Sequence, residues 1–168
     1  MRRILFVCHG NICRSPMAEA IFTHMLEEAG LTDRYAADSA AVSDEEIGRP
    51  VYPEANAELA RRGLKRSSHR ARQLAREDYA RYDFFVGMDM DNVRRMRVIF
   101  GGDPQRKIGL LLAYTERPRE VEDPWYTGRF GFVYDEIAEG CRALLEQLLQ
   151  DDARRHREGG GEDTIWRA

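Results

Sequence analysis

Residues 4–16 read ILFVCHGNICRSP, an apolar run followed by a short loop and a proline. The run Ile4–Val7 is continuous and β-rich, which is typical of a parallel strand that is buried on both faces. From Pro16 onward, apolar residues recur at helical spacing as far as Gly30, which predicts a helix of about fifteen residues. A buried strand that leads through a loop into a helix indicates an α/β fold. In such folds ligands bind beyond the carboxyl ends of the strands, so we expect a site at Cys8.

The same alternation of apolar runs and helical periods continues along the chain. Further strands are expected at residues 35–40, 82–88 and 108–113, and further helices at residues 53–62, 89–99 and 132–149. This order predicts one α/β domain over residues 1–150, with a mostly parallel, four-stranded, twisted sheet and helices on both faces. Residues 151–168 are charged, contain three consecutive glycines and show no hydrophobic period, so they are expected to form a disordered tail.

Composition excludes several classes of function. The 168 residues carry 26 basic and 29 acidic side chains, a net charge of -3 that argues against a nucleic-acid partner. The longest apolar run is about seven residues, whereas a membrane helix needs roughly 20, so no membrane span is expected. The apolar stretch after Met1 is too short for a signal peptide, and the mature protein is expected to start there. Three cysteines, an odd number, favour a reducing compartment, and the cytoplasm is the expected location.

The loop from Cys8 to Ser15 has the residue types of an oxyanion cradle. Gly10 and Asn11 both tolerate positive φ, which allows the loop to curl and point backbone N–H groups inward at a helix N-terminus. The same groups, together with Arg14, favour the thiolate form of Cys8, which is the nucleophilic form. The planar guanidinium of Arg14 can hold two phosphoryl oxygens at once, and Ser15 is placed to donate a hydrogen bond to the sulfur. The loop therefore predicts phosphate binding and attack by Cys8.

These residues resemble the signature of the low-molecular-weight protein tyrosine phosphatases. The catalytic loop of that family reads Cys, any, Gly, Asn, any, Cys, Arg, Ser, as residues 8–15 do here. Asp123-Pro124-Trp125-Tyr126 resembles a second family motif, whose aspartate is the general acid for the leaving phenolate. Segments 38–41, 68–73 and 88–89 also resemble the family, so the resemblance covers about residues 2–150. It implies the phosphotyrosine protein phosphatase I-like fold and the hydrolysis of phosphotyrosine through a cysteinyl-phosphate intermediate.

The resemblance also implies a role for individual side chains. Cys8, Arg14 and Asp123 would be catalytic. Asn11 would be held in its strained conformation by Ser39 and His69, while Asp89 would orient Arg14. Substrate and phosphate would be bound by the remaining loop residues and by two aromatic side chains, namely His9, Gly10, Asn11, Ile12, Cys13, Ser15, Trp125 and Tyr126. No cofactor and no metal are expected.

Alternatives of the same fold stay open at this point. Arsenate reductases need two further cysteines late in the chain, and only Cys141 lies downstream of the loop. Protein arginine phosphatases favour a small Thr where Ile12 stands. A phosphate-binding module without catalysis would be expected to lack Cys8 or Asp123. Glu45 stands where many relatives of the family place an aromatic residue that walls the cleft.

Partners follow from the expected reaction. They would be phosphotyrosine proteins and the tyrosine kinase that modifies them, with neither nucleic acid nor membrane. The oligomeric state is left open by the sequence.

Overall fold

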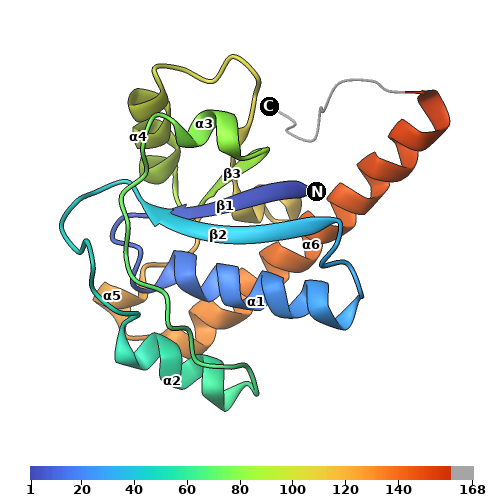
Figure 1. Cartoon of the computed structure of the whole chain (residues 1–168). Coiled ribbons are helices and arrows are strands. Elements are labelled where there is room, and N and C mark those ends of the chain that lie inside the picture. The colour runs from blue at the N-terminus through green and yellow to red at the C-terminus, as the bar shows by residue number, and fades with distance from the viewer. Residues whose placement is uncertain (160–168) are drawn as a thin grey trace.

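The sheet is parallel and has β1 at its centre. The computed structural model of the chain describes residues 1–159 (Figure 1). Its four strands are β1 (Arg2–Cys8), β2 (Tyr35–Ala41), β3 (Phe84–Gly87) and β4 (Ile108–Leu110), in the order β2-β1-β3-β4. Every pairing between neighbouring strands is parallel. The expected α/β fold with a four-stranded parallel sheet is therefore confirmed.

Helices cover both faces of this sheet because the strand residues alternate between two apolar clusters. Ile4 and Phe6 of β1 belong to the cluster formed with α1 and α6, whereas Leu5 and Val7 pack on the side of α4. In Figure 1, α1, α2 and α6 lie on one side of the sheet, and α3 and α4 lie on the other. The helical segments are α1 (Arg14–Glu28), α2 (Pro53–Arg61), α3 (Asp78–Arg81), α4 (Met90–Phe100), the 3-10 turn η1 (Leu111–Tyr114), α5 (Pro124–Thr127) and α6 (Phe130–Glu158).

The strand expected at residues 108–113 is shorter in the structure. It ends at Leu110, and the next four residues form the 3-10 turn η1, which packs against α6. The close approach depends on Gly140, because a Cβ there would lie 2.5 Å from Cγ of Leu111. The apolar run thus indicated a segment that packs into the core, but residues 111–114 do so as a 3-10 turn and not as a strand.

The prediction of a disordered tail from residue 151 is wrong for residues 151–158, because α6 continues to Glu158. Asp151 is buried, and Asp152 forms ion pairs with Arg2 and Arg34 and accepts a hydrogen bond from the Tyr35 hydroxyl. The charges that suggested a solvated tail therefore attach this part of the helix to the start of the sheet. The rest of the expected tail, residues 160–168, lies outside the described residues.

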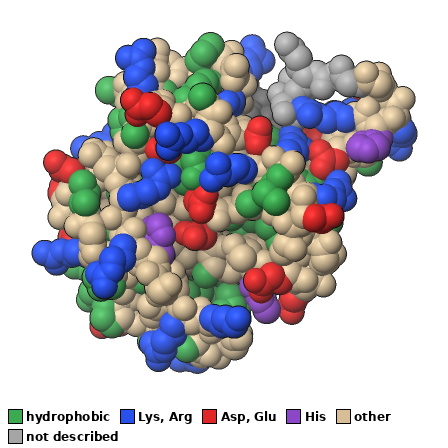
Figure 2. All heavy atoms as spheres, viewed as in Figure 1, with side chains coloured by type: hydrophobic (Ala, Val, Ile, Leu, Met, Phe, Trp, Pro, Cys, Tyr) green, Lys and Arg blue, Asp and Glu red, His purple; other side chains and the backbone are tan. Residues whose placement is uncertain are grey.

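The surface carries charges of both signs. Figure 2 shows Lys and Arg side chains interspersed with Asp and Glu over the visible face, without a continuous basic area. Within the described part of the chain, no helix is long and apolar enough to cross a membrane. The carboxyl end of β1 leads through a short loop into α1, and this junction holds the residues considered next.

Candidate active site

The loop between β1 and α1 curls around the sulfur of Cys8. Cys8 is the last residue of β1, and Arg14 is the first residue of α1. Asn11 takes a left-handed conformation with φ 59°, which turns its backbone N–H toward the sulfur at 3.3 Å. Ser15 Oγ lies 3.0 Å from the same sulfur. A backbone N–H and a hydroxyl group thus lie within hydrogen-bonding distance of the sulfur, and each is placed to donate to it.

The backbone conformation of Gly10 differs from the one that the sequence suggested. Its φ is not positive, and Asn11 alone in the loop adopts the left-handed conformation. The absence of a side chain at Gly10 matters for another reason, because a Cβ there would lie 3.2 Å from Cγ of Glu46. The absence of a side chain at Gly10 therefore allows the segment that carries Glu46 to pack against the loop.

Arg14 is nearly inaccessible to solvent, with 3% of its surface exposed. Its guanidinium donates to Asp89 Oδ2 at 2.9 Å, to the Val121 carbonyl at 3.2 Å and to Asp123 Oδ2 at 3.3 Å. Burial opposes the positive charge, but the neighbouring Cys8, Asp123 and Asp89 raise the pKa of Arg14 above its ordinary value. Arg14 is consequently a fixed cation at the floor of the site.

Asp89 is itself fixed by the start of α4. Its carboxylate accepts from the Asn92 N–H at 2.8 Å, while the Asn92 side chain accepts from the Asp89 N–H at 3.1 Å. This reciprocal capping box leaves the second oxygen of Asp89 directed at Arg14. The helix start thereby determines where the guanidinium lies.

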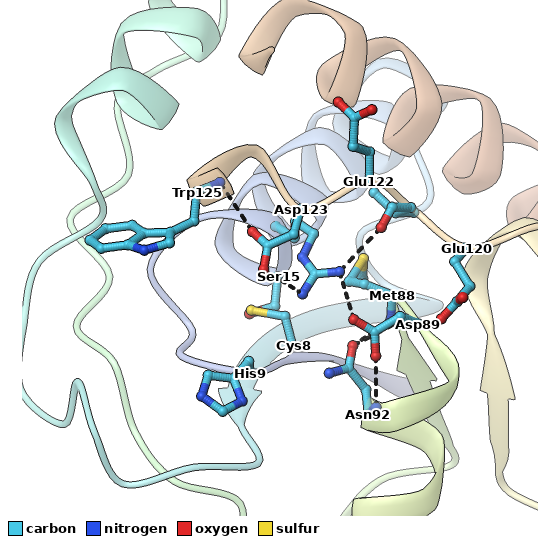
Figure 3. Close-up of polar contacts among 12 residues, drawn as sticks. Cys8, His9, Ser15, Met88, Asp89, Asn92, Glu120, Glu122, Asp123 and Trp125 are labelled. Carbon is cyan, nitrogen blue, oxygen red and sulfur yellow. Dashed lines mark hydrogen bonds and ion pairs between the residues drawn. The ribbon is translucent and has the colours of Figure 1, made fainter. Parts of the chain in front are cut away.

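Asp123 belongs to a segment 109 residues after Arg14 in the chain. It is the N-cap of α5, and its Oδ1 accepts from the Trp125 N–H at 3.1 Å. Figure 3 shows Asp123, Ser15 and Trp125 arranged around Cys8, with His9 on the other side. A cleft of about 190 Å³ opens between these groups. It is lined by Cys8, His9, Gly10, Ile12, Cys13, Arg14, Glu45, Glu46, Asp123, Trp125 and Tyr126.

Aromatic packing forms one wall of the cleft. The Trp125 ring lies 5.1 Å from that of Tyr52, which in turn stacks on Phe130 at 5.8 Å. Tyr126 borders the same cleft but is 84% exposed. Tyr52 was not singled out from the sequence, and its position far from both the loop and Trp125 along the chain gives no signal that it supports this wall.

A buried network holds Asn11 in its left-handed conformation. The side-chain nitrogen of Asn11 donates to Ser15 Oγ at 2.8 Å and to Ser39 Oγ at 3.0 Å. Its side-chain oxygen accepts from the backbone N–H of Arg72 at 3.1 Å and lies 2.6 Å from His69 Nε2. Because that oxygen can only accept, Nε2 of His69 carries a proton. Burial and the charge of Arg72 lower the pKa of His69, which favours the neutral form of its ring.

Glu19 was missed by the sequence reasoning and belongs to the same network. It accepts from Ser39 Oγ at 2.5 Å, and burial raises its pKa. A larger hollow of about 580 Å³ lies behind the network, between α1 and residues 63–69, and does not reach Cys8. The cleft at Cys8 is therefore smaller than this hollow but holds the sulfur of Cys8.

Cys13 also borders the cleft, and burial together with the nearby Cys8 raises its pKa far above the ordinary value. It is therefore a protonated thiol at neutral pH. Glu45 and Glu46 lie at the cleft as well, and His9 Nε2 lies 3.0 Å from Glu45 Oε2. Arg95, which the sequence reasoning missed, approaches the other ring nitrogen of His9 at 3.5 Å.

Comparison with known proteins identifies the family. The family model of the low molecular weight phosphotyrosine protein phosphatases matches residues 3–154. The chain belongs to this family. It is 38% identical over 153 residues to the low molecular weight protein-tyrosine-phosphatase YfkJ of Bacillus subtilis, with 90% of this chain and 98% of that protein covered. It is 37% identical over 151 residues to the human low molecular weight phosphotyrosine protein phosphatase, with coverages of 87% and 95%.

Solved structures of the family have the same fold. The crystal structure of YfkJ matches with a TM-score of 0.86 and covers 90% of this chain and 96% of its own. The crystal structure of DARP, described as a drosophila arginine phosphatase, matches at 33% identity with a TM-score of 0.79, covering 88% and 98%. Like the proteins of its family, this chain is an enzyme of the phosphatase class.

Proposed function

We propose that the protein hydrolyses phosphotyrosine in proteins, and small aryl phosphates, through a phosphate ester on Cys8. The observation that carries the proposal is one narrow cleft in which the Cys8 sulfur, a buried Arg14 and the carboxyl of Asp123 meet. A phosphoester needs a nucleophile in line with the leaving oxygen, positive charge for the equatorial oxygens and an acid for the leaving group. These three residues provide the three requirements.

The first step transfers the phosphoryl group to the enzyme. The Cys8 thiolate forms a bond to phosphorus as the bond from phosphorus to the tyrosine oxygen breaks. Asp123 gives its proton to the departing phenolate, while Arg14 and the loop N–H groups bind the equatorial oxygens. Trp125 provides an apolar face for the substrate ring.

The second step regenerates the enzyme. The Asp123 carboxylate removes a proton from a water molecule, whose oxygen attacks phosphorus as the bond to sulfur breaks. Inorganic phosphate leaves, and Cys8 returns to the thiolate that the Ser15 hydroxyl and the Asn11 N–H stabilise. Microscopic reversibility makes the same carboxyl group acid and base in turn.

Phosphoarginine hydrolysis is the second candidate, and the similarity to DARP is what favours it. Ile12 lines the cleft beside Cys8, and its bulk favours the flat ring of phosphotyrosine over the branched guanidinium. Arsenate reduction is less well supported, because Cys141 is fully buried in α6 and its sulfur faces the Ala18 carbonyl at 3.9 Å. It has no path to a disulfide relay with Cys8.

The test is hydrolysis of matched phosphotyrosine, phosphoserine and phosphoarginine peptides by the purified protein and by Cys8→Ser. We expect preference for phosphotyrosine, and in Cys8→Ser no turnover but retained binding of inorganic phosphate, because Arg14 and the loop amides are unchanged. Preference for phosphoarginine would replace the proposal with its alternative. Loss of phosphate binding along with activity in Cys8→Ser would contradict the role given to the loop.

The substrates are accordingly phosphoproteins, and we propose that the opposing tyrosine kinase is a partner. We also propose the cytoplasm as the compartment, since Cys8 and Cys13 are free thiols whose chemistry requires reducing conditions. Fractionation of cells followed by detection of the protein tests this location.

A further inference from the structure

The segment that carries Asp123 has no regular secondary structure, and its backbone at Val121 and Glu122 is hydrogen-bonded to other parts of the molecule at three points. The Val121 N–H donates to the Met88 carbonyl at 2.8 Å, and the Val121 carbonyl accepts from Arg14 at 3.2 Å. The third point is the Glu122 N–H, which donates to Oε1 of Glu136 at 3.0 Å. Glu122 directly precedes Asp123, so this hydrogen bond acts on the peptide next to the acid.

Glu136 lies on α6 and is 5% exposed. Its second oxygen accepts from Nε of Arg119 at 3.2 Å, so one carboxylate binds both ends of residues 119–122. Arg119 also donates to Glu139, one turn further along α6, at 2.9 Å. A carboxylate is costly to bury unless it is paired and hydrogen-bonded. Both oxygens of Glu136 are directed at this single segment.

The Asp123 carbonyl accepts from the N–H groups of Tyr126 and Thr127, which fixes its backbone only relative to the short turn α5. Its carboxylate contacts Trp125, which belongs to the same short turn, and Arg14, which is also meant to bind substrate oxygens. Outside the cleft, Glu136 accepts from the peptide N–H just before Asp123, whereas Arg129 and Thr127 hold only the side chain of Glu122. Productive proton transfer requires the acid to be held within about 0.5 Å of its working position.

From these contacts we propose that Glu136 is a positioning residue for the general acid. By accepting the Glu122 N–H, it directs the Asp123 carboxyl toward the leaving oxygen opposite Cys8. The inference rests on the proposed function, in which Asp123 is the acid. It assigns to the long helix α6 a part in the chemistry that no residue of the loop motif performs.

The test compares leaving groups, because weak leaving groups depend on the acid more than activated ones do. In Glu136→Leu, kcat/KM for phenyl phosphate should fall about tenfold more than kcat/KM for p-nitrophenyl phosphate. Glu136→Gln keeps an acceptor for the Glu122 N–H and should stay within about threefold of the native enzyme on both substrates. Glu139→Leu is the matched control, since it removes the other partner of Arg119 on the same helix and should alter neither value.

The double variant Asp123→Asn/Glu136→Leu distinguishes an effect of Glu136 on the position of Asp123 from a general effect on the stability of the fold. If Glu136 acts through Asp123, the second change adds no further loss on phenyl phosphate once the acid is absent. Should Glu136→Leu fail to fold, Glu136→Ser replaces it, because its side chain is too short to reach the Glu122 N–H.

Equal losses on the two substrates, or full additivity with Asp123→Asn, would overturn the inference while leaving the proposed function intact. Native protein without aryl phosphatase activity would instead overturn the proposed function.

Discussion

Asp123 uses its two carboxylate oxygens for different purposes. Oδ1 caps α5 and Oδ2 faces Arg14, so the side chain is held in the cleft before substrate arrives. Asp123→Asn keeps a cap acceptor but has no proton to give. We expect kcat/KM for phenyl phosphate to fall by about 10² to 10⁴, the usual share of general acid catalysis, and by less for p-nitrophenyl phosphate. Steady-state kinetics on the pair measures this, and equal losses would remove Asp123 from the role of acid.

Cys13 gives the site a second sulfur in the same cleft as Cys8. We expect peroxide to convert the Cys8 thiolate to a sulfenic acid, from which the Cys13 thiol then displaces water to form a disulfide. This bond prevents oxidation to the irreversible sulfinic acid. We expect dithiothreitol to restore activity after peroxide treatment in the native enzyme and much less in Cys13→Ser.

Cys141→Ser is the matched control for this prediction, because Cys141 is buried in α6 away from the cleft. It should recover as the native protein does. Equal recovery of Cys13→Ser and Cys141→Ser would show that Cys13 does not protect Cys8.

Asp152 joins the end of helix α6 to the start of the sheet through its contacts with Arg2, Arg34 and Tyr35. Burial alone raises the pKa of Asp152, but the hydrogen bond from Tyr35 and the charges of Arg2 and Arg34 outweigh it and lower the pKa. A carboxyl whose pKa is lower in the folded than in the unfolded state stabilises the fold above its unfolded value of about 3.9. That stabilisation is lost as the pH falls through the folded value.

Asp152→Asn should therefore reduce the free energy of unfolding at pH 7 by about 1 to 3 kcal/mol. Its stability should also depend less on pH below about 4 than that of the native protein. Urea unfolding at several pH values measures both effects. Glu146→Gln, an exposed carboxylate of the same helix, is the control and should change neither. A variant as stable as the native protein at pH 7 would show that the cluster contributes no net stability.

The sequence predicted those elements whose contacts are local. Residues 4–28 hold a buried strand, a loop and a helix in direct succession, and their spacing was sufficient to place Cys8, Arg14 and Ser15 together. The end of α6 was missed because Asp152 finds its partners 117 to 150 residues away, at Tyr35 and Arg2. Glu136 was missed for the same reason, since no spacing along the chain indicates which distant backbone a carboxylate will accept from.

The whole molecule has a net charge of only -3, so we expect its attraction for charged substrates to depend mainly on charges near the cleft. Glu45 and Glu46 both border the cleft, and the Glu45 side chain is 64% exposed. Carboxylates at this rim repel acidic residues beside a phosphotyrosine and attract basic ones. We expect the native enzyme to show a higher kcat/KM for phosphopeptides with basic flanks, and the preference to fade with salt, because rim charges are screened over roughly 8 to 10 Å.

Glu45→Tyr should weaken this preference and lower KM for aryl phosphates, because it exchanges a charge for a ring that can stack on the substrate. The measurement is kcat/KM for matched acidic and basic phosphopeptides at low and high salt. Glu45→Gln and Glu146→Gln form the control pair, since each changes the net charge equally but only the first lies at the cleft. If the two variants reduce the preference for basic flanks to the same extent, the total charge of the protein governs substrate attraction. If the native enzyme is indifferent to flanking charge at low salt, Glu45 is a solvated carboxylate without influence on selectivity.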